Sequence, residues 1–132
     1  LAARAGEGGA VTPEGATLKA CLSYLSLCGI FHFRNNNAPI PRKEKVGNTW
    51  NMVGFRKSAT PGLPDIIGIV AVGGEWKQAL PLAVEVKSAT GRQSPAQREF
   101  QAKWEHAGGL YLLVRSVDEL RNGLRDAGVE VK

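Results

Sequence analysis

The sequence reads LAVEVK from Leu82 to Lys87, an apolar run that carries an acid and a base two positions apart. Because side chains alternate between the two faces of a strand, Glu85 and Lys87 would share one face with Ala83, while the two valines occupy the other. A core strand does not hold unpaired charges without a reason, since their burial is costly. Two explanations are open: an ion pair on a solvent-facing edge, or a site that needs both charges.

A second run of strand-forming residues precedes this one. Residues 65–72 are rich in Ile and Val, and Gly73-Gly74 after them is a turn signal. We expect the runs 65–72 and 82–87 to pair as an antiparallel hairpin. Asp65, which directly follows Pro64, would then lie close to Glu85 near one end of the hairpin.

Such a pair of carboxylates favours a metal ion. Two carboxylates held together repel each other, and a divalent cation relieves that repulsion. Mg²⁺ prefers oxygen ligands and retains several waters, and the carbonyl of Val86 would complete the set with Asp65 and Glu85. Lys87 would orient or deprotonate a water that attacks a phosphorus centre and would offset developing charge. The hairpin therefore predicts a Mg²⁺ site.

Helix-start signals place the remaining elements around the hairpin. Thr12, Ser94 and Ser116 each stand where an N-cap residue would, the last two within capping-box patterns. The expected elements are a helix from Thr12 to Gly29, a strand over Ile30–Arg34, the two hairpin strands, a helix from Ser94 to about Ala107, a strand over Leu110–Val114 and a helix from Ser116 to about Asp126. This order, αβββαβα, predicts a single domain over residues 1–132, with residues 1–11 as a flexible arm.

Composition sets the broad class of protein. The chain has 132 residues, of which 43% are hydrophobic and 22% charged, values typical of one soluble globular domain. No apolar run approaches the ~20 residues that span a bilayer, and no secretion signal is evident. We therefore expect a cytoplasmic protein of a bacterium or a phage-infected host cell. Cys21 and Cys28 are too far apart along a helix to bridge, so we expect buried thiols.

The net charge is +5, and much of the excess lies in one segment. Residues 34–57 contain a single acid, Glu44, against six basic residues: Arg34, Arg42, Lys43, Lys45, Arg56 and Lys57. A basic field favours a polyanion such as DNA. Residues 35–61 show no periodicity, so we expect a long basic loop that faces DNA, with a short strand or packing anchor around Trp50 and Phe55; a plain surface loop is the alternative.

The two hairpin strands together resemble a known nuclease motif. Pro64-Asp65 followed by Glu85-Val86-Lys87 is similar to PD-(D/E)xK. The wider context resembles the VRR-NUC (virus-type replication-repair nuclease) family, with its G-x-P-D segment at residues 62–65 and its G-x-x-S-x-x-Q helix start at residues 91–97. The similarity extends from Pro13 to Leu124.

The resemblance implies a restriction-endonuclease-like core, a mixed four-stranded sheet flanked by helices, similar in fold to archaeal Holliday-junction resolvases. It also implies a homodimeric DNA endonuclease that needs Mg²⁺ or Mn²⁺ and selects branched DNA of the Holliday-junction or flap type. By position, Asp65 and Glu85 are implied metal ligands and Lys87 the catalytic lysine. Glu14 is implied to reach the metal directly or through water, and Gln97 to support the lysine or contact a phosphate.

Other functions remain open at this point. Arg92 and Arg98, beside the motif, join the six basic residues above as candidates for phosphate contacts. One alternative is a non-catalytic DNA-binding module that keeps the nuclease fold; another is an α/β domain whose Glu–Lys pair is only structural. Metal-dependent cleavage of DNA would support the enzyme over the non-catalytic binding module. DNA binding that weakens with salt, without cleavage, would support the binding module over the purely structural ion pair.

Overall fold

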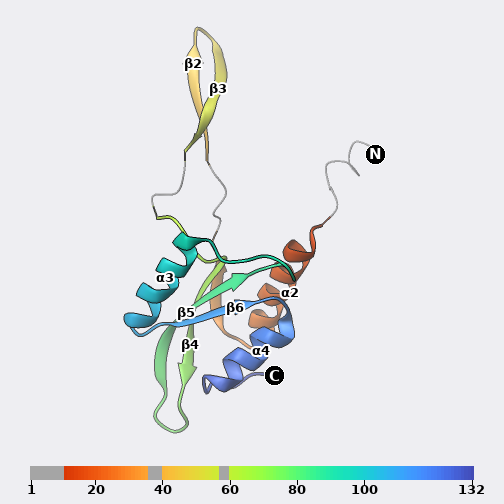
Figure 1. Ribbon diagram of the computed structural model, residues 1–132, viewed down its shortest axis with the longest axis vertical. Coiled ribbons are helices and arrows are strands. Elements are labelled where there is room, and N and C mark those ends of the chain that lie inside the picture. Colours follow the sequence, from red (N-terminus) through yellow and green to blue (C-terminus); the bar gives the residue numbers. More distant parts are fainter. Residues whose placement is uncertain (1–10, 36–39, 57–59) are drawn as a thin grey trace.

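The computed structural model describes residues 11–35, 40–56 and 60–132, apart from the side chain of Arg56. Its elements are α2 (Pro13–Leu27), β1 (Phe31–Arg34), β2 (Ile40–Val46), β3 (Thr49–Arg56), β4 (Ile66–Val72), β5 (Gln78–Val86), α3 (Pro95–His106), β6 (Leu110–Val114) and α4 (Val117–Asp126). With β2 and β3 set aside, the others follow the predicted order αβββαβα (Figure 1). The arm predicted for residues 1–11 lies, except for Val11, outside the described residues.

Four strands form one mixed sheet in the order β1-β4-β5-β6. β4 pairs antiparallel with both β1 and β5, whereas β5 and β6 run parallel. The predicted hairpin is confirmed, since Ile66 lies opposite Val84, although β5 begins at Gln78 rather than at Leu82. The ends of β4 and β5 that carry residues 65 and 85 therefore meet.

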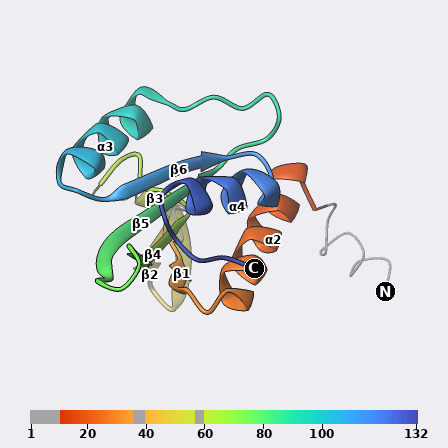
Figure 2. The ribbon, with the colours of Figure 1, turned by 90° about the horizontal axis from the view of Figure 1, so that it is seen from below.

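The core lies between one face of this sheet and the helices α2 and α4. Leu82, Val84 and Val86 of β5 point to that face and are buried. They pack with Leu18, Cys21 and Leu25 of α2, Ile66 and Val70 of β4, Val114 of β6, and Leu120 and Leu124 of α4. α3 lies on the other side of β6 from α4 (Figure 2). Cys21 and Cys28 are free thiols, as predicted; Cys21 is buried and Cys28 half-buried.

Side-chain caps fix where α3 and α4 begin. Ser94 and Gln97 form the predicted capping box, in which each side chain accepts the other residue's backbone N–H. At α4 only one of the two hydrogen bonds of the predicted capping box forms. Ser116 accepts the N–H of Glu119 at 3.1 Å, but Glu119 Oε1 accepts the N–H of Arg115, one residue before the cap. None of the described helices has the length and apolar character needed to cross a membrane.

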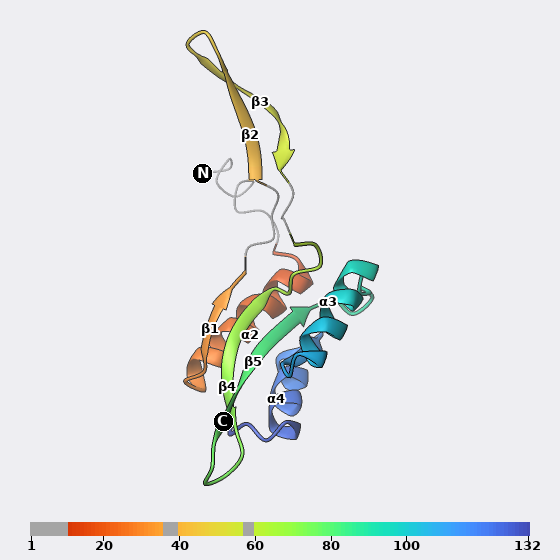
Figure 3. The same cartoon turned by 90° about the vertical axis from the view of Figure 1, so that its left-hand side faces the viewer.

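The loop predicted over residues 35–61 is wrong in its central part. There β2 and β3 pair antiparallel and form a hairpin that projects beyond the sheet (Figures 1 and 3). The short strand predicted around Trp50 is part of β3. Because almost every described side chain of this hairpin is exposed, no apolar–polar alternation marks its strands in the sequence. Residues 36–39 and 57–59 of the predicted loop lie outside the described residues.

The segment before Asp65 packs tightly against the start of α3. Gly62 has a φ of +77°, a conformation that side chains with a Cβ rarely adopt. A Cβ at this position would lie 2.3 Å from the carbonyl oxygen of Ala96, in the first turn of α3. Both observations require glycine here, and they tie the approach to Asp65 to the position of the helix.

Substitution of Gly62 by alanine should therefore destabilise the domain by more than the backbone conformation alone explains. Gly29→Ala is the matched control, because Gly29 has a φ of +69° with nothing within 4 Å of its Cβ position. We expect a loss of about 1 kcal/mol for Gly29→Ala and at least about 2–3 kcal/mol for Gly62→Ala in the free energy of unfolding by urea. Equal losses would show that the contact with Ala96 is unimportant.

Candidate active site

Asp65 and Glu85 meet at the open end of the β4–β5 hairpin. Ile66 and Val84 form the last paired position there, so the residues just beyond them, Asp65 and Glu85, are neighbours. Asp65 Oδ2 accepts the backbone N–H of Val86 at 2.8 Å. This bond fixes the carboxylate of Asp65 against the edge of β5.

Glu85 is the single buried charged residue in the described part of the chain, with 3% of its surface exposed. Its Oε1 atom is buried without a hydrogen-bond partner. Burial, followed by the nearby carboxylate of Asp65, raises the pKa of Glu85 to about 8, and Lys87 opposes that shift only in part. Without another cation, Glu85 therefore holds a proton at neutral pH.

Lys87 lies on the same face of β5 and contacts Glu85. Its Nζ atom is 3.6 Å from Glu85 Oε2, and its side chain is 14% exposed. Its backbone N–H donates to the carbonyl of Val114 on β6 at 2.9 Å. The structure thus brings together Asp65, Glu85 and Lys87, three of the four residues that the sequence predicted for catalysis, Gln97 being the fourth.

The carbonyl of Val86 faces the same edge as Asp65. In a strand, successive residues direct their backbone groups to opposite sides. Lys87 directs its N–H to β6, so the N–H and carbonyl of Val86 both point toward the β4 side, as the bond to Asp65 shows. A third oxygen is therefore available beside the two carboxylates.

These oxygens fit a hard divalent cation. A buried carboxylate oxygen without a partner, a second carboxylate and a backbone carbonyl are ligands that Mg²⁺ accepts, with water in the remaining positions. The described residues contain no group of three or more His, Cys, Asp or Glu side chains placed to hold a metal. Glu14, exposed in the first turn of α2, is accordingly not gathered with Asp65 and Glu85.

Arg115 holds the loop that follows Lys87, and sequence analysis missed it. Its guanidinium donates to the carbonyl of Ser88 and, at 2.8 Å, to that of Gly91. The parallel register places Val114 beside Val86, so the residue after β6 lies beside Lys87, and no short sequence motif signals this pairing. That register was not predicted.

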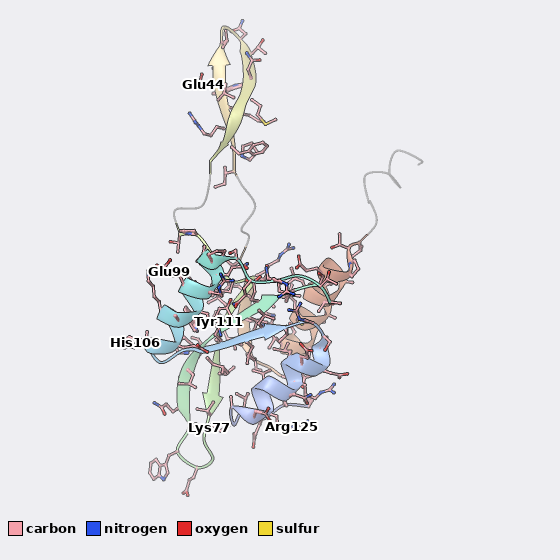
Figure 4. All side chains as sticks on the ribbon, in the orientation of Figure 1. Glu44, Lys77, Glu99, His106, Tyr111 and Arg125 are labelled. Atoms are coloured by element: carbon pink, nitrogen blue, oxygen red, sulfur yellow. The ribbon has the colours of Figure 1, made fainter. Side chains whose placement is uncertain are left out.

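Tyr111 was missed as well and forms part of the wall of the site. It lies on the edge strand β6 opposite Ala83, hence on the face that carries Glu85, and Figure 4 labels it between α3 and α4. Burial, together with the carboxylates of Glu85 and Asp65, raises the pKa of Tyr111 to about 12. Its hydroxyl accepts a hydrogen bond from Gln93 Nε2 at 3.3 Å, so it remains a neutral polar group beside the carboxylates.

The other residues predicted for catalysis or DNA binding lie on different elements and do not join the Asp65–Glu85–Lys87 cluster. Gln97 caps α3, and its Oε1 atom is used by Ser94. Arg34 ends β1 beside the start of β4, Arg92 is exposed in the loop before α3, and Arg98 donates to the carbonyl of Gln93. Arg42, Lys43 and Lys45 are exposed on β2, far from the sheet. Neither Lys57 nor the side chain of Arg56 is among the described parts of the chain.

The fold and the site define an α/β domain with two carboxylates and a lysine at the end of an antiparallel strand pair. The sequence model of the VRR-NUC domain matches residues 51–118, a span that includes all three residues. This is more than half of the chain, so the chain belongs to the VRR-NUC family, and the resemblance seen in the sequence is confirmed. Nuclease-type processing of DNA is therefore its class of function. Neither the curated proteins nor the solved structures gave a match.

The raised pKa of Glu85 predicts that the metal-free domain is more stable in mild acid. Between the ordinary pKa of 4.5 and about 8 the folded chain holds a proton that the unfolded chain releases, so the free energy of unfolding falls as pH rises through this window. Glu85→Gln, which does not titrate, should lose that dependence and be more stable than the wild type at about pH 8. Thermal unfolding in EDTA, from about pH 5 to about pH 8, measures it.

The control for this experiment is Glu99→Gln, since Glu99 is exposed on α3. Its melting temperature should follow the wild-type pH profile. A Glu85→Gln profile with the same slope as the wild type would contradict the placement of a buried, protonated Glu85.

Proposed function

We propose that this domain is an endonuclease that hydrolyses DNA phosphodiester bonds with a divalent cation, Mg²⁺ or Mn²⁺, and that its fold is the restriction-endonuclease-like PD-(D/E)xK core. One observation carries the proposal: the Glu85 carboxylate is buried with an unpartnered oxygen beside a second carboxylate. Such a pair lowers stability unless something compensates it. A cation in a site of the nuclease family supplies that compensation.

The ligands of the cation would be Asp65, Glu85 and the carbonyl of Val86, with water in the remaining positions; Glu14, which the resemblance also implied, is not placed among them. When bound, such a cation lowers the pKa of a water and polarises a phosphate oxygen. Loss of the proton from Glu85 leaves two negative charges side by side, which matches the charge of a divalent ion. Cation binding and the protonation of Glu85 therefore oppose each other.

Lys87 is the catalytic lysine in this proposal. Its ammonium, held at Glu85, would orient the attacking water and offset the charge that develops on the phosphate. Gln97 would support the site through the cap of α3, whose first turn packs against Gly62, or would contact a phosphate.

Exposed arginines and the hairpin would bind the DNA backbone. Arg34 at the end of β1, Arg92 in the loop before α3 and Arg98 on α3 would contact phosphates. The basic segment supplies Arg42, Lys43, Lys45, Arg56 and Lys57. We propose that the enzyme selects DNA structure, of the Holliday-junction or flap type, and acts as a homodimer. A resolvase needs two sites related by a two-fold axis, which a dimer provides.

The proposal predicts metal-dependent cleavage that needs each catalytic residue. Labelled four-way junction, flap and linear duplex are incubated with Mg²⁺, Mn²⁺ or EDTA, and products are separated by gel electrophoresis. Asp65→Ala and Lys87→Ala should each reduce cleavage at least about a hundredfold. The first variant removes a ligand of the metal ion, and the second removes the ammonium group that stabilises the transition state. Binding of DNA in EDTA should persist in both variants.

Lys77→Ala is the control. Lys77 lies in the turn between β4 and β5, at the opposite end of the four-stranded sheet from the β2–β3 hairpin (Figure 4), and the variant should cleave like the wild type. Absence of cleavage of every substrate with either metal would refute the enzyme. Salt-sensitive DNA binding in that case would favour the non-catalytic DNA-binding module.

The homodimer predicts a mass in solution of about twice the 14.1 kDa of the chain. Phe31 and Ile69, opposite each other on β1 and β4, are 66% and 52% exposed, so the sheet carries an uncovered apolar area suited to a second copy. Phe31→Glu should lower the mass toward the monomer in light scattering, whereas Trp76→Glu, at an exposed turn, should not. A monomeric wild type would contradict the homodimer.

A further inference from the structure

The β2–β3 hairpin has no packing that explains its side chains. It stands clear of the four-stranded sheet and the helices in two perpendicular views (Figures 1 and 3), and within the described ranges its strands pair with each other and with no further strand. A lone two-stranded hairpin is marginally stable in water. It nevertheless exposes Trp50, Met52 and Phe55 by about 60% each, which is an unfavourable surface for a segment without a partner.

One face of the hairpin combines these apolar side chains with lysines. Lys45 lies opposite Trp50, and Lys43 lies opposite Met52, and directly opposed residues of an antiparallel pair point to the same face. Phe55 lies opposite Pro41 on that face as well. Glu44, the one acid of the segment, alternates to the other face. The face therefore presents ammonium groups interleaved with an indole, a thioether and a phenyl ring.

This combination fits unpaired nucleotides. Lysines attract the phosphate backbone, and aromatic rings stack on bases in single strands, where every base has an open face. In a duplex the bases already stack on one another, and exposed rings of this size would meet only groove edges. Charge and chemistry together favour a single strand over a paired helix.

Described residues that precede and follow the hairpin in the chain lie at the candidate active site. Before β2, Asn35 donates its backbone N–H to the carbonyl of Asp65 at 2.7 Å and its side-chain amide to that of Pro64 at 3.2 Å. After β3, the chain returns through Gly62 to Asp65. A seven-residue strand such as β2 spans about 23 Å, enough to follow several nucleotides from the scissile position.

We propose that the Lys43, Lys45, Trp50, Met52 and Phe55 face of the hairpin binds unpaired nucleotides next to the duplex that is cut. The inference rests on the proposed nuclease function and names its substrate class: flaps and splayed ends, in which a single strand leaves a duplex, rather than fully paired four-way junctions. Trp50 and Phe55 stack on bases, and the two lysines contact the phosphates between them.

Equilibrium binding in EDTA tests this without any cleavage. Wild-type protein is titrated against fluorescein-labelled splayed duplex and against blunt duplex with the same number of phosphates. The wild type should bind the splayed DNA about tenfold more tightly. Trp50→Ala should remove most of that preference, a change of about tenfold for the loss of one stacked base, and leave affinity for blunt duplex unchanged.

Two variants make the result interpretable. Trp76→Ala removes a tryptophan that is even more exposed than Trp50, 87% against 63%, from the turn between β4 and β5, and it should bind both DNAs like the wild type. Trp50→Phe keeps an aromatic ring and should restore most of the preference. Trp50→Phe also perturbs the hairpin, so a preference for splayed DNA that persists in this variant shows that the aromatic ring, rather than an intact hairpin alone, is what the binding requires.

Three outcomes would overturn the proposal. Unchanged DNA binding by Trp50→Ala would exclude stacking of Trp50 on a base. Equal losses of affinity for splayed and blunt DNA would show that the hairpin binds a duplex groove. A Trp50→Ala protein with half the wild-type mass in solution would show that the hairpin contacts a second copy of the chain. Failure of the nuclease itself would appear elsewhere, as absent cleavage with metal, and would leave the binding measurements intact.

Discussion

A single hydrogen bond, from the amide of Val86 to the carboxylate of Asp65 at 2.8 Å, sets the chemistry of this domain. It lies just beyond the last paired position of β4 and β5, where a side chain takes the place of a backbone acceptor. Asp65 is thereby held beside Glu85, and the burial of Glu85 gives their repulsion its strength. Burial first, and then the carboxylate of Asp65, raises the pKa of Glu85.

Packing on the other face of β5 offsets the unfavourable burial of Glu85. Leu82, Val84 and Val86 are fully buried between the sheet and two helices, and the strand cannot shift by one residue without moving them into solvent. Their packing keeps Glu85 in a place that an isolated carboxylate would avoid. Stability and function thus occupy opposite faces of one strand, separated by the alternation of its side chains.

Sequence patterns could predict those structural features that depend on residues close together in the chain or on the alternation of side chains along a strand. The β4–β5 hairpin, the caps at Ser94 and Ser116, and the convergence of Asp65 with Glu85 all rest on spacing along a strand or within one helical turn. Tyr111 and Arg115 could not be found this way, because their neighbours come from the parallel pairing of β5 with β6, which no short motif encodes. The β2–β3 hairpin was missed because a strand exposed on both faces has no apolar period. Glu14 matched a family position, yet its surroundings depend on how α2 packs.

The parallel pairing of β5 with β6 also bears on the order in which the molecule can assemble. β4 and β5 are adjacent in the chain and can form early, whereas β6 reaches β5 only after the crossover through α3 has closed. The two carboxylates are local to the hairpin, but the anchor of Lys87 on Val114 and the hold of Arg115 on the following loop arrive with the last contacts. A chain in which β6 has not yet joined would therefore hold Asp65 beside Glu85 without the backbone anchor of Lys87 on Val114.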